Sequence, residues 1–271
     1  MKKILNVALL LLITAGTYAA KVETPDEIIA AQTKIIQANP NDAEAYKKRG
    51  EAYFGKRDFN KAILDYTQAI KLNPTDMELY ALRGRSYYNN RDINSGIEDY
   101  EKVVPYYEEE IKRHPNKIEN YRILGAAYSY LDEYDKSISI MSKAIKITSD
   151  NTELAKLYSN RGNVYGIKKD FAHAIEDFTK AIELDPKLDF PYINRGTVYG
   201  INKDYDRAIS DFEQAIKLSP LNPQLYHNLG KVYFEKKDYV NARKNLRECL
   251  RIDPNHGQAK DLLNKVDEAE K

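Results

Sequence analysis

The sequence is poor in the residues and motifs on which catalysis usually depends. Its 271 residues include no tryptophan and a single cysteine, Cys249, so an intramolecular disulfide is excluded. The four histidines are widely separated and lack metal-ligand spacing: His114, His173, His227 and His256. A glycine-rich phosphate loop and a Gly-x-Ser-x-Gly elbow are both absent. We therefore expect no enzymatic activity, no metal and no cofactor.

The chain also lacks an excess of charge of either sign. Lysine and arginine total 42 against 41 aspartates and glutamates, which gives a net charge of +1. Strong phosphate binding usually needs a clustered basic excess, so nucleic acid is not an expected partner. Charged residues make up 31% and hydrophobic residues 42%, which excludes a disordered tail or a membrane protein as a whole.

The first twenty residues differ from the rest of the chain. A short basic start, MKK, precedes the apolar run ILNVALLLLITAG and the ending TYA at Ala19. This layout predicts a cleaved secretory signal peptide over residues 1–19, and its lysine start resembles bacterial signals. The alternative is an uncleaved membrane anchor, but the apolar run is shorter than the roughly 20 residues that a membrane span needs. A lipoprotein anchor is excluded because no cysteine follows the apolar run. We expect an exported protein, periplasmic or secreted, without a membrane span after cleavage.

One pattern recurs six times beyond residue 42. Its centre is a glycine, at spacings of 34, 41, 37, 34 and 34 residues: Gly50, Gly84, Gly125, Gly162, Gly196 and Gly230. A tyrosine stands four residues before and three residues after each glycine. A small residue follows twelve positions later, and a large apolar one four positions beyond that. A proline closes most units, as in KLNP and ELDP.

These offsets predict a helical hairpin in each unit. Spacings of three, four and seven place the tyrosines and the glycine on one helix face, and the small and large residues on a second helix. An acidic residue near the end of the intervening turn can cap the second helix, and the proline stops it. In an antiparallel hairpin, the offsets of two facing residues, counted from the glycine, add up to the same value, which is 12 in these units. The glycine should therefore face the small residue, so that the two helices approach closely.

The pattern of Tyr, Gly, Tyr, Ala, Phe or Tyr, Ala and Pro at a 34-residue period resembles the tetratricopeptide repeat (TPR). The resemblance implies an all-α fold, a right-handed α-solenoid of helix-turn-helix hairpins. Six repeats are expected, at residues 43–76, 77–117, 118–154, 155–188, 189–222 and 223–256. We predict a capping helix at each end, the N-terminal one over residues 20–42 and the C-terminal one over residues 257–271, which shield the open ends of the solenoid from water.

Two units depart from the period. The unit at 77–117 has seven extra residues, about two helical turns, so its second helix can lengthen without rotating its apolar face. Pro105 should kink that helix. This irregular edge is either a docking site or a tolerated insertion. The next unit is three residues longer before Tyr158, and we place these residues in the loop TSDNTE.

Four units carry arginine directly before the glycine, where the TPR family usually has leucine. The same four units carry aspartate fifteen residues after the glycine, whereas the two leucine units, with Leu124 and Leu229, have Ile140 and Asn245. The two offsets sum to 14, close to the hairpin value of 12, so arginine and aspartate should meet. Pairing Asp65 with the arginine of the next unit would also be possible in that one case, but the pattern across the units fits pairing within a repeat better. We predict four structural ion pairs: Arg49–Asp65, Arg83–Asp99, Arg161–Asp177 and Arg195–Asp211.

The resemblance also implies a concave groove, lined by the first helices, that takes a peptide. The groove candidates in the first three units are basic and aromatic: Lys47, Arg85, Tyr88, Arg122 and Tyr130. Those in the last three units are neutral: Asn160, Asn163, Asn194, Thr197 and Asn228. The asparagines form either a ladder of amide donors for a bound backbone or ordinary consensus positions. A carboxylate clamp of the family is incomplete, since Ser159, Gln224 and Asn228 stand where cations should be.

The sequence thus favours a non-catalytic scaffold for protein–protein interaction, which binds a protein or peptide partner in its concave groove. The alternative is an accessory or assembly factor of cell-envelope machinery that docks through the irregular edge around Pro105. A monomer is expected. The pattern does not identify the partner.

Overall fold

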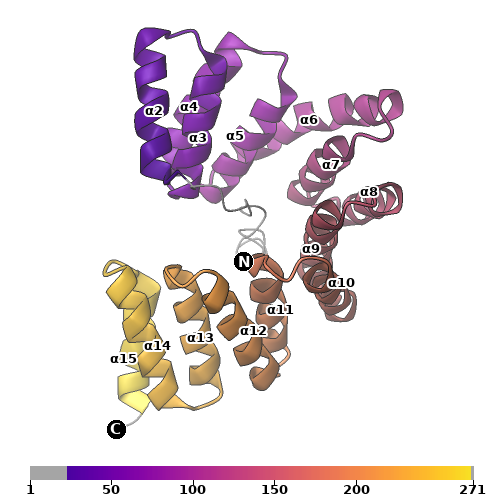
Figure 1. Ribbon diagram of the computed structural model, residues 1–271. Helices are drawn as coiled ribbons and strands as arrows, with labels where there is room; N and C mark the ends of the chain where they lie inside the picture. The colour runs from indigo at the N-terminus through magenta and orange to yellow at the C-terminus, as the bar shows by residue number, and fades with distance from the viewer. Residues whose placement is uncertain (1–22, 270–271) are drawn as a thin grey trace. The chain divides into compact units, whose positions relative to one another are not determined.

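The computed structural model describes residues 23–269, which form helices joined by short turns (Figure 1). The chain divides into two units, the first ending at Thr148 and the second starting at Ser149. The predicted signal peptide at residues 1–19 lies outside the described residues. Within residues 23–269, no helix combines the length and the apolarity needed to cross a membrane.

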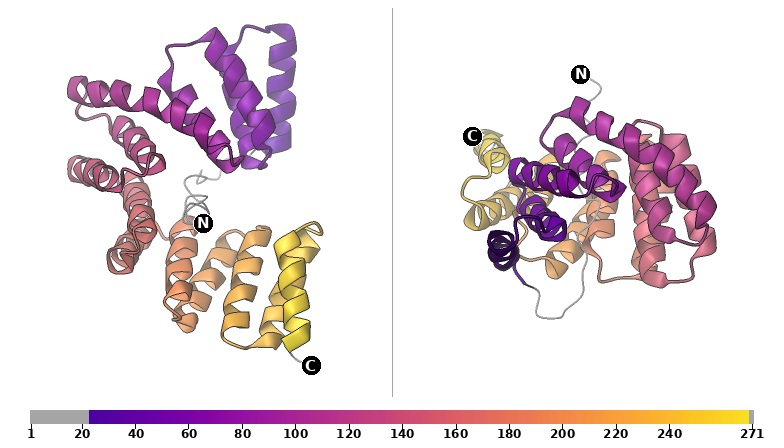
Figure 2. Two further views of the ribbon diagram at one scale, coloured as in Figure 1. Left: turned by 180° about the vertical axis from the view of Figure 1, so that it is seen from behind. Right: turned by 90° about the horizontal axis from the view of Figure 1, so that it is seen from above.

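From residue 23 onward, the first unit contains seven helices: α2 (Pro25–Ala38), α3 (Ala43–Gly55), α4 (Phe59–Leu72), α5 (Met77–Asn89), α6 (Ile93–Arg113), α7 (Ile118–Tyr130) and α8 (Tyr134–Ile147). The second unit contains seven more: α9 (Asn151–Ile167), α10 (Phe171–Leu184), α11 (Asp189–Ile201), α12 (Tyr205–Leu218), α13 (Pro223–Glu235), α14 (Tyr239–Ile252) and α15 (Gly257–Ala269). Figure 2 shows α11 to α15 side by side in one row. The prediction of an all-α repeat solenoid is confirmed.

Each hairpin turn is built in the same way. An aspartate caps most of the second helices, and Asp204, for example, accepts the Arg207 N–H at 3.3 Å. One non-glycine residue per turn has a left-handed backbone, with φ between 60° and 66°: Arg57, Arg91, Asp132, Lys169, Lys203 and Lys237. A left-handed residue reverses the chain within a short turn, at a steric cost of roughly 1 kcal/mol for an L-residue.

The glycines lie where the two helices of a hairpin approach most closely. A Cβ atom on Gly84 would be 3.3 Å from the Gly96 carbonyl oxygen, and one on Gly196 would be 3.3 Å from the Ala208 carbonyl oxygen. Both partners stand twelve residues after their glycine, as the offset argument requires. Side chains at these positions would push the helices apart.

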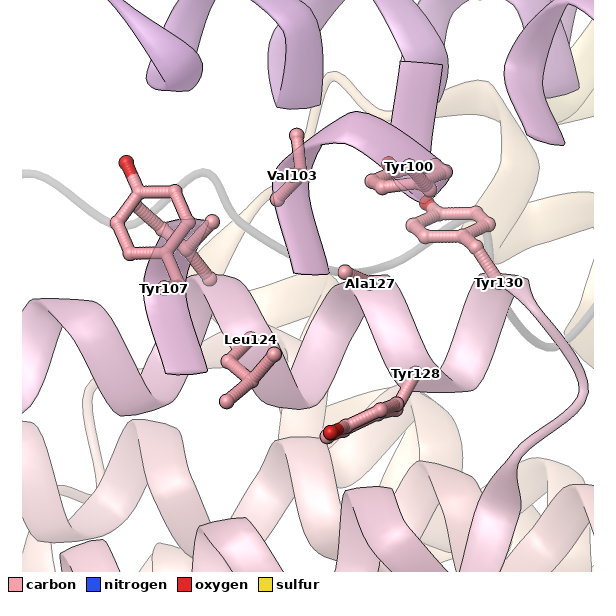
Figure 3. Close-up of a cluster of buried hydrophobic side chains, with 8 residues drawn as sticks. Tyr100, Val103, Tyr107, Leu124, Ala127, Tyr128 and Tyr130 are labelled. Carbon is pink, nitrogen blue, oxygen red and sulfur yellow. The ribbon is translucent and has the colours of Figure 1, made fainter. Parts of the chain in front are cut away.

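The seven extra residues of the second repeat extend α6, which continues through Pro105 to Arg113. The extension is packed rather than free, because Tyr107 is 6% exposed and joins a cluster with residues of α7 (Figure 3). The cluster also contains Tyr100, Val103, Leu124, Ala127, Tyr128 and Tyr130. The Tyr128 hydroxyl donates to Glu108 on the same extension.

The extra residues before Tyr158 do not form a loop, so that prediction is wrong. Helix α9 begins at Asn151 and has 17 residues, against 13 in α11. Asp150 caps the added turn by accepting the Glu153 N–H at 2.8 Å. A good N-cap at this point favours lengthening the helix over leaving the segment as coil.

Helices α2 and α15 cover the outer faces of the terminal repeats. Thr24 and Glu27 form a reciprocal capping box at the start of α2. On α15, Ala259 and Val266 are fully buried in a cluster with Leu246 and Cys249 of α14. The buried cluster shields the apolar face of the last repeat from water.

Candidate functional site

All four Arg–Asp pairs are present, and each is bidentate. The arginine Nε and Nη2 atoms donate to the two carboxylate oxygens at 2.7–2.8 Å: Arg49–Asp65, Arg83–Asp99, Arg161–Asp177 and Arg195–Asp211. The aspartates are at most 5% exposed. The parallel fork geometry fixes the relative position of the two helices in each hairpin.

The arginines also bridge successive repeats, which the sequence reasoning missed. The remaining guanidinium nitrogen, Nη1, donates to a threonine hydroxyl sixteen residues earlier, at 2.9–3.2 Å: Arg49 to Thr33, Arg83 to Thr67 and Arg195 to Thr179. Thr33 belongs to α2, so the N-terminal capping helix is joined to the first repeat as one repeat is to the next. The recurrence of threonine at this offset was the available signal.

Burial and pairing act against each other in these ion pairs. Hydrogen bonding to Asp99 raises the pKa of Arg83, so its guanidinium stays charged. Burial raises the pKa of the Asp177 carboxyl despite the Arg161 guanidinium beside it. The Arg161 guanidinium therefore offsets part of the desolvation of Asp177, as is typical of buried ion pairs.

The first helices of the repeats carry the residues predicted to line a groove. These odd-numbered helices contact one another, α5 with α7 in the first unit and α9 with α11 and α11 with α13 in the second. In the first unit they carry the basic and aromatic candidates. Lys47 of α3 forms an ion pair of 2.7 Å with Glu78 of α5, and Arg85 of α5 lies 4.1 Å from the centre of the Phe54 ring on α3.

An aromatic cluster continues this surface toward α7. The Tyr88 ring lies 4.8 Å from that of Tyr130, and the Tyr88 hydroxyl donates to the Tyr130 carbonyl oxygen. Tyr130 is 4% exposed and stacks on Tyr100, so it supports the surface and does not present its ring to a partner. Arg122 is half-buried and pairs with Glu119 on α7.

The asparagines of the second unit do not form an exposed ladder. Asn160, Asn163 and Asn194 are 1–3% exposed, and Asn194 Nδ2 donates to Asn163 Oδ1 at 2.7 Å. This bond joins α11 to α9, so the amides hold neighbouring first helices together. The residue offsets place these asparagines on the first helices, but they do not report how closely the two helices approach.

The other two candidates of the second unit are half-buried and make internal bonds. The Thr197 hydroxyl donates to the Ile193 carbonyl oxygen at 2.7 Å. Asn228 Oδ1 accepts from Gln224 Nε2 at 2.9 Å. Gln224 belongs to a larger polar cluster in which the rings of His227 and His256 stack with centres 5.0 Å apart. The sequence spacing of the two histidines gave no sign of this contact.

The described residues offer little for catalysis. Between residues 23 and 269, no group of three or more His, Cys, Asp or Glu side chains is placed to hold a metal ion. The Cys249 thiol is fully buried, and burial raises its pKa to about 11, so it remains protonated at neutral pH.

The fold and these contacts define an all-α solenoid of two-helix repeats joined by polar side chains. Tetratricopeptide repeat models match residues 43–76, 118–151, 155–188 and 223–256, and a TPR repeat model matches residues 201–237. Together these matches span more than half of the chain, which therefore belongs to the tetratricopeptide repeat family. Its repeats support a role as a protein-interaction scaffold, and this family is generally non-catalytic.

Solved structures show the same fold at low sequence identity. A tetratricopeptide repeat protein from Parabacteroides merdae ATCC 43184 is 17% identical with a TM-score of 0.61, over 89% of this chain and 90% of that one. A chain of the APC/C hetero-tetramer Cut9–Hcn1 is 20% identical with a TM-score of 0.60, over 89% of this chain and 46% of that one. The present chain thus spans less than half the length of the latter. No curated protein matches the sequence.

Proposed function

We propose that this protein is a non-catalytic scaffold that binds a protein or peptide segment across α3, α5 and α7 of the first unit. The observation that carries the proposal is the half-buried surface formed by Lys47, Arg85, Tyr88 and Arg122. These side chains come from three successive first helices, so an extended segment that crosses the helices can reach all of them.

The composition of this surface suits recognition of a protein. Arginine and tyrosine are the residue types on which binding energy concentrates in interfaces. Phe54 holds Arg85 by a cation–π contact, and the Tyr130 ring and backbone hold Tyr88, so both lose little conformational freedom on binding. A partner that places an acidic or aromatic side chain against Arg85 and Tyr88 fits this chemistry.

The surface is not uniformly basic, which limits the choice of partner. Glu78 and Glu119 already pair with Lys47 and Arg122. Desolvation raises the pKa of Glu51 on the same helix as Lys47, although the lysine acts against this. A strongly anionic polymer would meet these carboxylates as well, so a protein segment of mixed character is favoured.

The second candidate is docking through the extension of α6. Tyr106 is 42% exposed beside Pro105, and Glu109 lies on the same extension, paired with Lys112. An exposed aromatic next to a helical proline can anchor a partner, so this edge could serve an assembly factor of envelope machinery. The extension has an equally good structural explanation, because the buried Tyr107 packs against α7 and so stabilises the fold.

Affinity capture with matched variants distinguishes the two candidates. Full-length bait is crosslinked to its partners in the native cell and compared with Arg85→Ala, Arg122→Ala, Tyr106→Ala and the control Leu64→Ser. Leu64 is 68% exposed on α4, outside both surfaces. We expect Arg85→Ala and Arg122→Ala to lose the partner and the other two variants to retain it. Loss with Tyr106→Ala alone would support the edge, and retention by all variants would reject both.

The exported location is part of the proposal. It rests on the signal-like residues 1–19, and a partner in the cell envelope or outside the cell follows from it.

A further inference from the structure

The C-terminal capping helix α15 is joined to the last repeat through an uninterrupted polar chain. The Ala259 N–H, in the first turn of α15, lies 3.2 Å from His256 Nδ1. His256 Nε2 lies 3.4 Å from Gln224 Oε1 on α13, and Gln224 Nε2 lies 3.1 Å from His227 Nδ1. The chain therefore runs from the backbone of α15 to a buried imidazole of α13.

This chain is complete only while both imidazoles are neutral. The Ala259 N–H can only donate, and it lies 3.1 Å from the His256 carbonyl oxygen as well as 3.2 Å from His256 Nδ1. Its contact with Nδ1 is a hydrogen bond only while that nitrogen is unprotonated, in which case His256 Nε2 carries the proton that reaches Gln224 Oε1. One N–H of the Gln224 amide donates to Asn228 Oδ1 at 2.9 Å, and the other has its acceptor at His227 Nδ1 while that nitrogen is unprotonated. His256 thus acts as an N-cap for α15, the role that asparagine or aspartate has in other helices.

Protonation breaks the chain at both histidines. A proton on His256 Nδ1 would face the Ala259 N–H, and the cation would lie at the positive end of the α15 dipole. A proton on His227 Nδ1 would face the Gln224 amide N–H and would instead favour Asn228 Oδ1, 3.4 Å away. Two stacked imidazolium rings 5.0 Å apart would also repel each other.

We propose that the chain His256–Gln224–His227 is a pH-sensitive latch, which holds α15 on the last repeat at neutral pH and releases it in acid. The released helix would uncover the buried cluster of Leu246 and Cys249. The latch is independent of the surface on the first unit and of its partner.

The surroundings of the His227 ring favour its neutral form. Burial, and then the neighbouring His256, lower the pKa of His227 to about 4. Its folded-state pKa is below the usual 6.5, so the stabilisation is complete above pH 6.5 and is lost as the pH falls toward 4. The charged and titratable groups that act on His227 are His256 and, on α13, Lys231, and both lower its pKa. On α14, Cys249 interacts with the His227 backbone and with the C-cap Asp253, and the first turns of α15 contain Lys260 and Asp261.

The only cysteine of the chain is a natural reporter for this latch. Cys249 is fully buried in the cluster that α15 covers, so a thiol reagent reaches it only when α15 moves away. The experiment measures the reaction of Cys249 with 4,4′-dithiodipyridine between pH 7.5 and 4.5. The rate is divided by that of the urea-unfolded protein at the same pH, which removes the pH dependence of the thiol itself.

We expect the protection of Cys249 to fall on the order of 10- to 100-fold between pH 7 and 4.5, with the far-UV CD signal nearly unchanged. His256→Asn, which keeps a neutral cap, should reduce this change, and the double variant with His227→Gln should abolish it. His114→Gln is the control, since His114 is the exposed C-cap residue of α6 in the first unit and should leave the change intact.

Three results would overturn the latch. These are protection that does not vary with pH, a double variant that keeps the wild-type dependence, and thiol exposure that occurs only together with loss of the whole CD signal. If the double variant fails to fold at pH 7, the single His256→Asn variant decides alone, because wild-type dependence in that variant refutes the role of His256.

Discussion

The Arg83–Asp99 pair gives the sharpest test of how the repeats are held together. The two helices of this hairpin, α5 and α6, are joined by bonds of 2.8 Å from Arg83 Nε and Nη2 to the Asp99 carboxylate. The Asp99 side chain is 2% exposed and that of Arg83 14% exposed. The third repeat supplies a natural apolar alternative, since Leu124 and Ile140 occupy the equivalent positions.

The single change Arg83→Leu leaves a buried carboxylate without its cation. Breaking a buried pair in this way costs about 3–5 kcal/mol. It also removes the bond from Arg83 to Thr67, a contribution of about 0.5–1.5 kcal/mol. The double change Arg83→Leu with Asp99→Ile removes the buried charge altogether. We expect its free energy of unfolding to lie within about 1.5 kcal/mol of the wild type, the residual loss being the Thr67 bond.

The free energies of unfolding are measured by urea titration followed by far-UV CD for the wild type, both single variants and the double variant. The predicted coupling energy from this double-mutant cycle is at least about 2 kcal/mol in favour of the pair. If the double variant is as unstable as Arg83→Leu, the buried aspartate is not the source of the cost and the reasoning is refuted. Arg122→Leu, whose ion pair with Glu119 is partly exposed, should change stability by less than about 1 kcal/mol.

Three further predictions concern backbone fit and processing. Gly96→Ala should destabilise by about 1–3 kcal/mol in urea, because the new Cβ would lie 2.4 Å from the Tyr88 ring, whereas Gly55→Ala meets nothing within 4 Å and should be neutral or stabilising. Equal effects of the two changes would contradict the packing argument. Lys203→Gly should raise the free energy of unfolding by roughly 0.5–1 kcal/mol, since φ is 61° at this position, and a loss of stability would argue against strain there. Intact mass of the exported protein should place the new N-terminus near Ala20, and a mass that retains residues 1–19 would reject cleavage.

The repeat and its packing could be predicted from the sequence because they are periodic. The glycine recurs where two helices touch, and the offsets of Arg83 and Asp99 bring them together in any antiparallel hairpin of this length. Such positions depend on geometry within one repeat, which the spacing of residues fixes.

Contacts between repeats were harder to predict. The burial of Asn163 and Asn194 depends on how closely α9 and α11 approach, and the offset of a residue gives its helix face but not that distance. The stacking of His227 on His256 joins a repeat to its capping helix, so no periodic pattern reports it. Helix α9 is longer than predicted because a single N-cap residue, Asp150, stabilises the added turn. The sequence does not report whether one such cap makes the helix more stable than a loop.

The central claim is that the first helices of the first unit form the binding surface. The most direct measurement places the photo-reactive amino acid p-benzoylphenylalanine at Tyr88, at Leu64 or at Tyr106 of the full-length chain and irradiates living cells. We expect a discrete crosslinked adduct from position 88, weakened by Arg122→Ala, and none from the exposed positions 64 and 106. Adducts from position 64 or 106 in the absence of one from position 88 would contradict it.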